Sequence, residues 1–263
     1  MSISRSTPAA SLIDAVVHLF SGQAGHLSTT QHDRLVAEYR EMPFCPTPDM
    51  HTLWDLLFAL FDTTRLALLD PPFGFSLDKE LSILDVACGR CEEVITLPAF
   101  FARMLPELPA QSVHFYGTDL RDKMIRQANT YCGRTCSFFE QRVGGELSPF
   151  RYLLKSGDAT NPELWMHFPD AFDVVFFRHQ NAWNGADIWT RIFDEALARC
   201  KPGGVLIITS YFDREHELTT QLLSGLGAEL VCTLRNPRSR ELKTPEKSID
   251  RHIALFRKRG MFL

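Results

Sequence analysis

Hydrophobic positions along the chain change their pattern at about residue 80. From Leu81 onward, short apolar runs alternate with longer stretches of helical periodicity. The apolar runs are predicted as strands at Leu81–Ala87, Val113–Gly117, Arg151–Leu154, Phe172–Phe177, Val205–Ser210, Glu229–Leu234 and His252–Phe256. Helices are predicted between them at Glu92–Leu105, Asp122–Tyr131, Ile188–Cys200 and around Glu215–Leu226. This alternation predicts an α/β fold with a mostly parallel sheet covered on both faces, closed by an antiparallel pair at its edge.

The segment before this change reads as helices separated by breaks. An amphipathic helix is predicted at Ser11–Phe20, a more polar one at Thr30–Met42, and a strongly apolar one at His51–Leu69. Two prolines and a glycine at positions 71, 72 and 74 then mark a boundary. We interpret residues 1–75 as an N-terminal helical cap or lid segment and residues 76–263 as the main domain. The apolar helix is expected either to pack on the core or to cover a site.

Composition narrows the class of protein. The chain has 263 residues with 28 Lys and Arg, 32 Asp and Glu, and a net charge of -4, so no overall charge attracts nucleic acid. The first apolar stretch, Leu12–Phe20, is short and contains Asp14, which excludes a membrane span there. Seven scattered cysteines do not form a secreted disulfide framework. We expect a cytoplasmic protein without a membrane partner; the sequence carries no signal of its oligomeric state.

Candidate functional residues are expected directly after the strands, because ligands of open α/β sheets bind beyond the carboxyl ends of the strands. The first strand runs into Asp85-Val86-Ala87-Cys88-Gly89-Arg90-Cys91, and the second into Gly117-Thr118-Asp119-Leu120. The third is followed by Gly157-Asp158-Ala159 and the fourth by Arg178-His179-Gln180-Asn181. A Lys201-Pro202-Gly203-Gly204 turn is predicted before the fifth.

These motifs, in this order, resemble those of the class I S-adenosylmethionine-dependent methyltransferases, over about Leu81 to Phe256. The family has an acidic residue and spaced glycines after strand one, and an acidic residue ending strand two. A Gly-Asp-Ala-like turn follows strand three, and a Lys-Pro-Gly-Gly turn precedes strand five. The resemblance implies a Rossmann-like doubly wound sheet of seven strands, mostly parallel with an antiparallel edge strand. It also implies S-adenosyl-L-methionine as cofactor.

The resemblance assigns roles to single residues. Asp85 would bind near the amino acid end of the cofactor, and Gly89 would let the backbone approach it. Asp119 would bind the ribose hydroxyls, and Asp158 with Ala159 the adenine edge, although Asp158 alone could equally be a helix N-cap. The whole expected cofactor set is Asp85, Ala87, Cys88, Gly89, Asp119, Leu120, Asp158, Ala159 and Arg178.

Two features depart from the family pattern. Ala87 and Cys91 stand where the family has glycines, and Cys91 is expected to narrow the site or change the path of the loop. Pro98 lies inside a predicted helix, where proline removes a hydrogen bond and clashes with the preceding turn. We therefore expect a kink there or a new helix beginning near Pro98.

Residues after strand four are the candidates for catalysis. His179 has a suitable ordinary pKa for a general base, Arg178 could hold an anionic group of the substrate, and Asn181 could orient a polar one. A structural role for His179 is an equal alternative. A pocket lined by Tyr211, Phe212, Trp54 and Phe58 would suit a small, partly apolar methyl acceptor. The Asn/Asp-Pro-Pro-aromatic tetrapeptide of many DNA and protein methylating enzymes is missing, which disfavours those substrates.

Other interpretations stay open. A nicotinamide dehydrogenase would need more glycines in the first loop, and Glu92 and Glu93 would repel its pyrophosphate. Cys88, Cys91, Cys132 and Cys136 could form a zinc or redox site, but ordinary thiols are favoured and no metal is expected. The basic stretch from Arg235 to Arg259 is interpreted as a solvated hairpin rather than an RNA surface. A tRNA or protein methyltransferase, or a catalytically silent regulator with this fold, is the alternative function.

Overall fold

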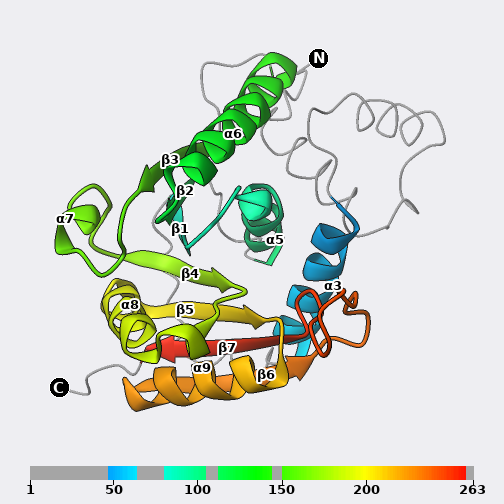
Figure 1. Ribbon diagram of the computed structural model, residues 1–263. Helices are drawn as coiled ribbons and strands as arrows, with labels where there is room; N and C mark the ends of the chain where they lie inside the picture. Colours follow the sequence, from blue (N-terminus) through cyan, green and yellow to red (C-terminus); the bar gives the residue numbers. More distant parts are fainter. Residues whose placement is uncertain (1–46, 64–79, 105–111, 144–149, 259–263) are drawn as a thin grey trace.

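The computed structural model describes residues 47–63, 80–104, 112–143 and 150–258 (Figure 1). Seven strands form one sheet in the order β3-β2-β1-β4-β5-β7-β6. The first five are β1 (Glu80–Val86), β2 (Ser112–Asp119), β3 (Phe150–Ser156), β4 (Phe172–Arg178) and β5 (Cys200–Ser210), all parallel. Strand β7 (His252–Lys258) is antiparallel to both β5 and β6 (Ala228–Arg235). Strand β1 lies in the middle of the sheet, β2 and β3 are added on one side of it, and β4 and β5 on the other. The strand order therefore reverses between β1 and β4.

The predicted doubly wound, Rossmann-like fold is therefore confirmed, with two differences in detail. The antiparallel strand β7 lies one place inside the edge, and the edge strand is β6. The Lys201–Gly204 run is not a turn but the start of β5, where Cys200 pairs with Phe172 of β4. A Cβ at Gly204 would lie 3.0 Å from the carbonyl oxygens of Phe172 and Asp173, so this glycine permits a close approach of two strands.

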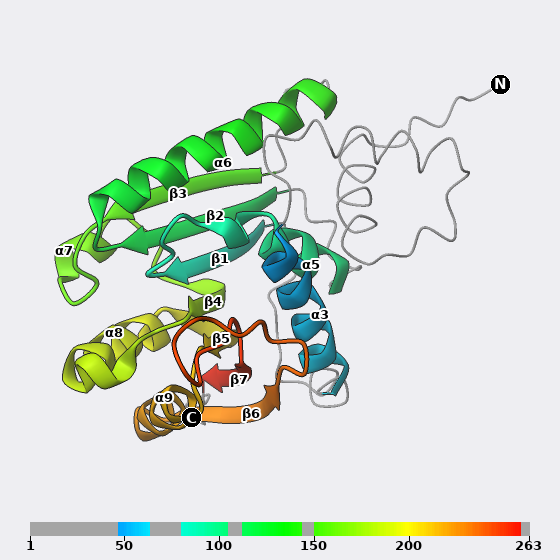
Figure 2. The same ribbon diagram turned by 45° about the vertical axis from the view of Figure 1, so that its right-hand side comes forward.

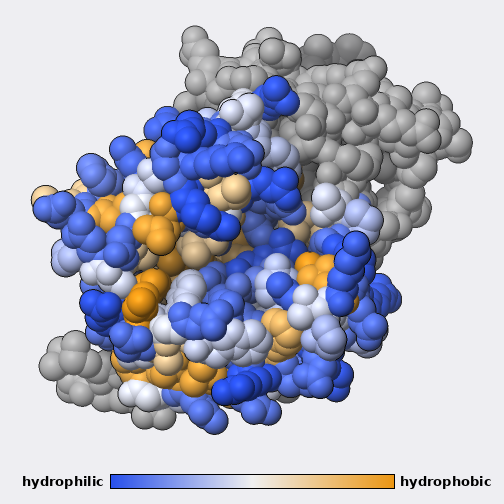
Figure 3. Space-filling model, viewed as in Figure 1, coloured by the Kyte–Doolittle hydropathy of each residue, from blue (hydrophilic) through white to orange (hydrophobic). Residues whose placement is uncertain are grey.

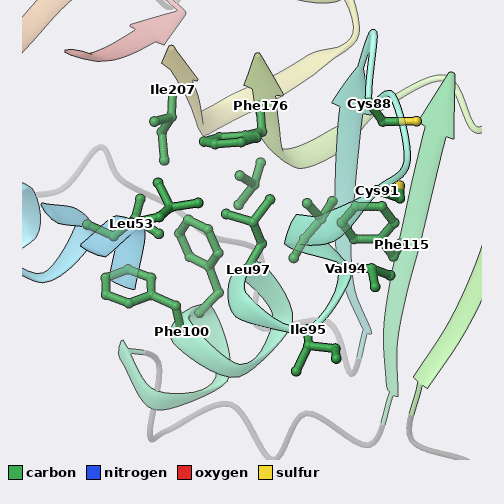
Figure 4. Packing of buried hydrophobic residues seen from close by; sticks show 14 of the residues in the cluster. Leu53, Cys88, Cys91, Val94, Ile95, Leu97, Phe100, Phe115, Phe176 and Ile207 are labelled. Carbon is green, nitrogen blue, oxygen red and sulfur yellow. The ribbon is translucent and has the colours of Figure 1, made fainter. Parts of the chain in front are cut away.

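Helices cover both faces of the sheet (Figure 2). On one face lie α3 (Pro48–Thr63), α5 (Thr96–Met104) and α6 (Asp122–Val143). On the other lie α7 (Pro162–Trp165), α8 (Ala186–Ala198) and α9 (Asp213–Gly225). Each face of the sheet has its own hydrophobic core, and alternate residues of a strand point into the two cores. Ile83 packs on the first face and its neighbour Leu84 on the second. Figure 4 shows Leu97 and Phe100 of α5 between Leu53 of α3 and the strand residues Phe176 and Ile207. None of the described helices is long and apolar enough to cross a bilayer.

Helix α3 belongs to the core over its described length. Leu53, Leu57 and Leu60 are fully buried, and Trp54 meets Phe100 edge to face at 5.4 Å between ring centroids. Of the two interpretations of this apolar helix, packing on the core is the one that the structure supports. Residues 64–69 of the predicted helix, the earlier helices and the boundary prolines lie outside the described residues, so the division at residue 75 stays a prediction.

The predicted effect of Pro98 on its helix is confirmed. A short 3₁₀ turn, η2 (Glu92–Val94), follows the first loop, and α5 begins separately at Thr96. Pro98 thus lies in the first turn of α5, where a backbone N–H has no intrahelical acceptor and its loss is tolerated.

Candidate functional site

A cavity of about 560 Å³ lies at the carboxyl ends of β1 to β4, where the strand order reverses. Figure 3 shows this face hollowed between the surfaces over α6 and α8, with hydrophobic side chains at its margin. The exposed hydrophobic residues Leu120 and Ile188 line the cavity. Most of the predicted site residues meet here: Ala87, Cys88, Gly89, Asp119, Leu120, Asp158, Ala159, Arg178, His179 and Asn181 all line the cavity. Asp85 does not.

The loop after β1 keeps the backbone of a glycine-rich loop without most of the glycines. Ala87, Gly89 and Cys91 all have left-handed backbones, with φ of 57°, 56° and 59°. Such a conformation is unfavourable by about 1–2 kcal/mol for a residue with a Cβ. Cys91 is fully buried and does not line the cavity, so the expectation that it narrows the site is wrong. Its side chain points into the core near Phe115, away from the face of the loop that borders the cavity (Figure 4).

Asp85 lies under this loop rather than beside the cavity. Its side chain is fully buried and neither carboxyl oxygen has a hydrogen-bond partner among the described residues. Burial, reinforced by the nearby Glu93, raises the pKa of Asp85 well above its ordinary value. The expected contact of Asp85 with the cofactor stays a prediction, and its carboxyl does not line the cavity.

Asp119, at the end of β2, is held by four hydrogen bonds. Its Oδ2 accepts from the backbone N–H of Gly89 at 3.0 Å and from Nη2 of Arg121 at 3.0 Å. Its Oδ1 accepts from both the backbone N–H and Nε of Arg121 at 2.9 Å. Burial alone would raise the pKa of Asp119, but the bonds from Arg121 outweigh it and the pKa is lowered. The carboxylate is therefore ionised and fixed beside the loop glycine.

Asp158 forms a turn and is not a helix cap. Its Oδ1 accepts from the backbone N–H and the hydroxyl of Thr160 at 2.9 and 2.8 Å, and these bonds lower its pKa. The N-cap of α7 is Asn161, whose side chain accepts from the N–H of Glu163. Asp158 is exposed at the cavity wall, so the adenine-edge role stays a prediction with its competing explanation removed.

Arg178, the last residue of β4, lies in a buried ionic network. Its Nε and Nη2 donate to the two carboxylate oxygens of Asp250 at 3.0 and 2.7 Å, and its Nη1 donates to Glu93 at 2.5 Å. The hydroxyl of Thr209 also donates to Asp250 at 2.7 Å. Asp250 is fully buried; burial opposes its ionisation, but Arg178 and His179 lower its pKa far below the ordinary value. Two carboxylates thus compete with the predicted role of Arg178 in holding a substrate anion.

His179 is held in a strained backbone conformation against the same carboxylate. Its φ is +61°, and strain of this kind at a cavity is typical of functional sites. Its Nε2 lies 2.8 Å from Oδ1 of Asp250, to which the protonated nitrogen can donate, and 3.0 Å from the backbone nitrogen of the same residue. The ring stacks on Tyr211 at 3.7 Å, and the ammonium of Lys247 lies 4.1 Å from the centre of the same tyrosine ring. His179 is therefore rigidly oriented in the cavity wall.

The strand order, with these motifs placed in turn around its switch point, decides the fold. The fold is that of the class I methyltransferases. Its characteristic features here are five parallel strands in the order β3-β2-β1-β4-β5 and the β7-β6 pair that closes the sheet.

Comparison with solved structures finds similarity to several methyltransferases. An S-adenosylmethionine-dependent methyltransferase from Clostridium acetobutylicum is 11% identical, with 87% of this chain and 99% of that chain covered and a TM-score of 0.49. A magnesium protoporphyrin IX methyltransferase from Synechocystis is 12% identical, covers 98% of this chain and 100% of that chain, and has a TM-score of 0.47. The N-methyltransferase NodS from Bradyrhizobium japonicum is 15% identical over 68% of this chain and 86% of that chain, with a TM-score of 0.43. No protein-family model and no curated protein sequence matches the chain.

The predicted apolar pocket is only partly present. Tyr211 lines the cavity, but Phe212 packs on Trp183 outside it. Trp54 is buried in the core and Phe58 is half exposed on α3, so neither lines the cavity and that part of the prediction is wrong. The apolar wall comes instead from residues of α8 that the sequence did not single out: Ile188, Trp189 and Ile192.

Two further alternatives are weakened by the surroundings of the residues concerned. The Cys91 thiol hydrogen-bonds with the thiols of Cys88 and Cys132, and burial raises its pKa well above the ordinary value, as expected of ordinary buried thiols. No group of three or more His, Cys, Asp or Glu among the described residues is arranged to hold a metal ion. The arginines of the basic C-terminal stretch form ion pairs: Arg238 with Asp55, Arg240 with Asp49, Arg251 with Asp213, and Arg257 with Glu229. This pairing favours a solvated hairpin.

Proposed function

We propose that the protein is an S-adenosyl-L-methionine-dependent methyltransferase acting in the cytoplasm on a small, partly apolar acceptor. The observation that carries this proposal is the cavity itself. It brings together a glycine loop, an ionised aspartate at the end of β2 and a polar turn after β3, next to a fixed histidine after β4. A volume of about 560 Å³ lies in the range of ligand sites for molecules of this size.

The residues around the cavity suit the parts of the cofactor. The carboxylate of Asp119 can accept hydrogen bonds from two ribose hydroxyls, and the apolar Leu120 and Ile188 can cover a purine ring while Asp158 and Ala159 meet its edge. The cofactor would supply the sulfonium methyl group. Glu92 and Glu93 also line the cavity, and they disfavour the pyrophosphate of a nicotinamide cofactor.

The residues after β4 would serve the acceptor. Asp250 engages Nε2 of His179, whereas Nδ1 has no hydrogen-bond partner among the described residues. With the proton of the neutral ring on Nε2, directed at Oδ1 of Asp250 2.8 Å away, Nδ1 is the nitrogen that can take a proton from a nucleophile as it attacks. Asn181 is exposed in the cavity wall and can orient a polar group, and Trp189 and Tyr211 offer apolar surface. These features support an acceptor with one ionisable atom on a partly apolar body.

Calorimetric titration with S-adenosylmethionine, S-adenosylhomocysteine and NADH tests the cofactor. We expect binding of the first two and none of NADH. Asp119→Ala is expected to weaken that binding about 10- to 100-fold, because hydrogen bonds to a charged group are each worth about 1.5–3 kcal/mol. Asp122→Ala is the matched control, since Asp122 is an exposed carboxylate three residues away that does not line the cavity. Absence of binding would overturn the proposal and favour the catalytically silent alternative.

A screen of small acceptors for S-adenosylhomocysteine release tests the chemistry. We expect an acceptor whose turnover falls in His179→Gln while the affinity for S-adenosylhomocysteine is retained. Equal turnover of wild type and His179→Gln on every acceptor found would remove the general-base role and leave His179 as a structural histidine. Methylation of tRNA or protein, without turnover of any small molecule, would replace the proposed acceptor class.

A further inference from the structure

The carboxylate that the proposed function assigns to the ribose is already fully used within the chain. Arg121 supplies three of the four hydrogen bonds to Asp119, and two of these come from its guanidinium. The fourth comes from the backbone of Gly89. Ribose hydroxyls can donate to Asp119 only where one of these donors gives way, because a carboxylate offers about four acceptor positions.

The guanidinium of Arg121 lies on the cavity side of the loop. Arg121 lines the cavity, and a Cβ built on Gly89 would lie 3.8 Å from its Nη2. The arginine therefore spans the glycine and the carboxylate, which are the two groups between which a ribose would have to lie. The guanidinium of Arg121 therefore occupies space that the proposed ligand would need.

The two partners differ in their freedom to move. The side chain of Arg121 is 63% exposed, whereas that of Asp119 is 3% exposed. Asp119 keeps the backbone N–H groups of Gly89 and Arg121 whatever the arginine side chain does. The guanidinium can thus rotate into solvent, where water replaces its hydrogen bonds, while the carboxylate stays ionised and in place.

We propose that Arg121 is a displaceable latch on the ribose subsite, bound to Asp119 in the free protein and released by a ligand with vicinal hydroxyls. This inference rests on the proposed function, because it concerns the same subsite. The latch makes binding an exchange: a ligand gains the carboxylate only by breaking the arginine pair. Ligands that cannot hydrogen-bond to Asp119 leave the arginine pair in place, so the latch lowers the affinity only of ligands that use this carboxylate.

Binding of S-adenosylhomocysteine to wild type, Arg121→Ala and Arg126→Ala tests the latch by calorimetry. Arg126 is the matched control, an exposed arginine paired with Asp122 on the neighbouring helix turn. We expect Arg121→Ala to bind about three- to fivefold more tightly, the size set by an ion pair with one exposed partner. Arg126→Ala is expected to match wild type. Unchanged or weaker binding in Arg121→Ala overturns the latch, and weaker binding would mean that the arginine contacts the ligand itself.

Two uncharged probes separate the latch from other charge effects. Adenosine and 2′,3′-dideoxyadenosine are measured by competition against S-adenosylhomocysteine. The gain in Arg121→Ala is expected for adenosine and not for the dideoxy compound. Raising the salt concentration from about 50 to about 500 mM screens the exposed pair and is expected to tighten adenosine binding to wild type only. Equal gains for both probes overturn the latch. If S-adenosylhomocysteine binds neither wild type nor variant, the proposed cofactor fails and the latch fails with it; if it binds both equally, the latch alone fails.

Discussion

Replacing Asp250 with asparagine removes one charge from the buried network at the end of β4. Asparagine keeps the size of the side chain and tolerates the left-handed backbone of this residue, whose φ is 47°. The change leaves Arg178 with Glu93 as its sole carboxylate partner within the described residues. Because Asp250 is fully buried and the side chain of Arg178 is only 11% exposed, water can compensate the guanidinium charge only in part. Breaking one half of a buried pair is expected to lower the free energy of unfolding by about 3–5 kcal/mol.

The chain provides a matched control for burial. Asp213 also receives two hydrogen bonds from one arginine, from Nε and Nη2 of Arg251 at 2.6 and 3.0 Å, but its side chain is 53% exposed. Asp213→Asn makes the same chemical change in the same kind of pair, and we expect a loss below about 1 kcal/mol. Equilibrium urea unfolding of wild type and both variants at pH 7 gives the comparison directly.

The pH dependence supplies a second measurement. The folded-state pKa of Asp250 lies below its ordinary value of 3.8, so its stabilising contribution is complete above that value and is lost as the pH falls through the folded-state pKa. The difference between wild type and Asp250→Asn should be constant above about pH 5 and shrink below about pH 4. An Asp250→Asn loss no larger than that of Asp213→Asn, or a difference independent of pH down to about pH 3, would refute the reasoning.

Three other comparisons, each measured by equilibrium unfolding, test separate parts of the structure. Gly117→Ala would place a Cβ 2.7 Å from a leucine side chain of β3 and is expected to lower the free energy of unfolding by about 1–3 kcal/mol. Gly225→Ala, whose Cβ would have nothing within 4 Å, should be neutral or stabilising. Equal effects of the two variants would contradict the packing at Gly117. Burial raises the pKa of Glu215 to about 7 from 4.5, so wild type should lose stability relative to Glu215→Gln as the pH rises from about 4.5 through 7, and a flat difference would exclude the shift. Trp54→Ala should cost about 3–5 kcal/mol and the half-exposed Phe58→Ala much less; the reverse order would mean that α3 is not a core helix.

The sequence predicts the fold well because each strand and helix has a recognisable local pattern of apolar residues. Each strand is a short apolar run with its own flanking polar residues, and the ligand-facing positions follow the strands directly, as Asp119 and His179 do. The alternation of Ile83 and Leu84 between two cores needs only the period of a strand. Even the separate start of α5 follows from one proline.

What the sequence could not supply is the pairing of distant charges. Glu93, Arg178 and Asp250 are separated by 85 and 72 positions, and nothing near any of them in the sequence indicates the others. The burial of Asp85 was not predicted for a related reason, since a motif does not report whether its carboxyl is buried without a partner among the described residues. A weak local signal existed only for Arg121, two residues after the acid that ends β2; an arginine so placed can turn back onto that carboxylate.

The segment between β6 and β7 contacts both helix α3 and the wall of the cavity. Figure 2 shows this segment beside α3. Arg240 pairs with Asp49 of α3, and further along the segment Asp250 pairs with Arg178 and His179. During synthesis on a ribosome, five of the parallel strands can therefore assemble before the carboxylate that orients His179 has emerged. Until then Glu93 is the one carboxylate among the described residues that pairs with Arg178, and the wall of the cavity after β4 is unfinished. Under the proposed function, cofactor affinity is therefore acquired before catalytic competence as the chain grows.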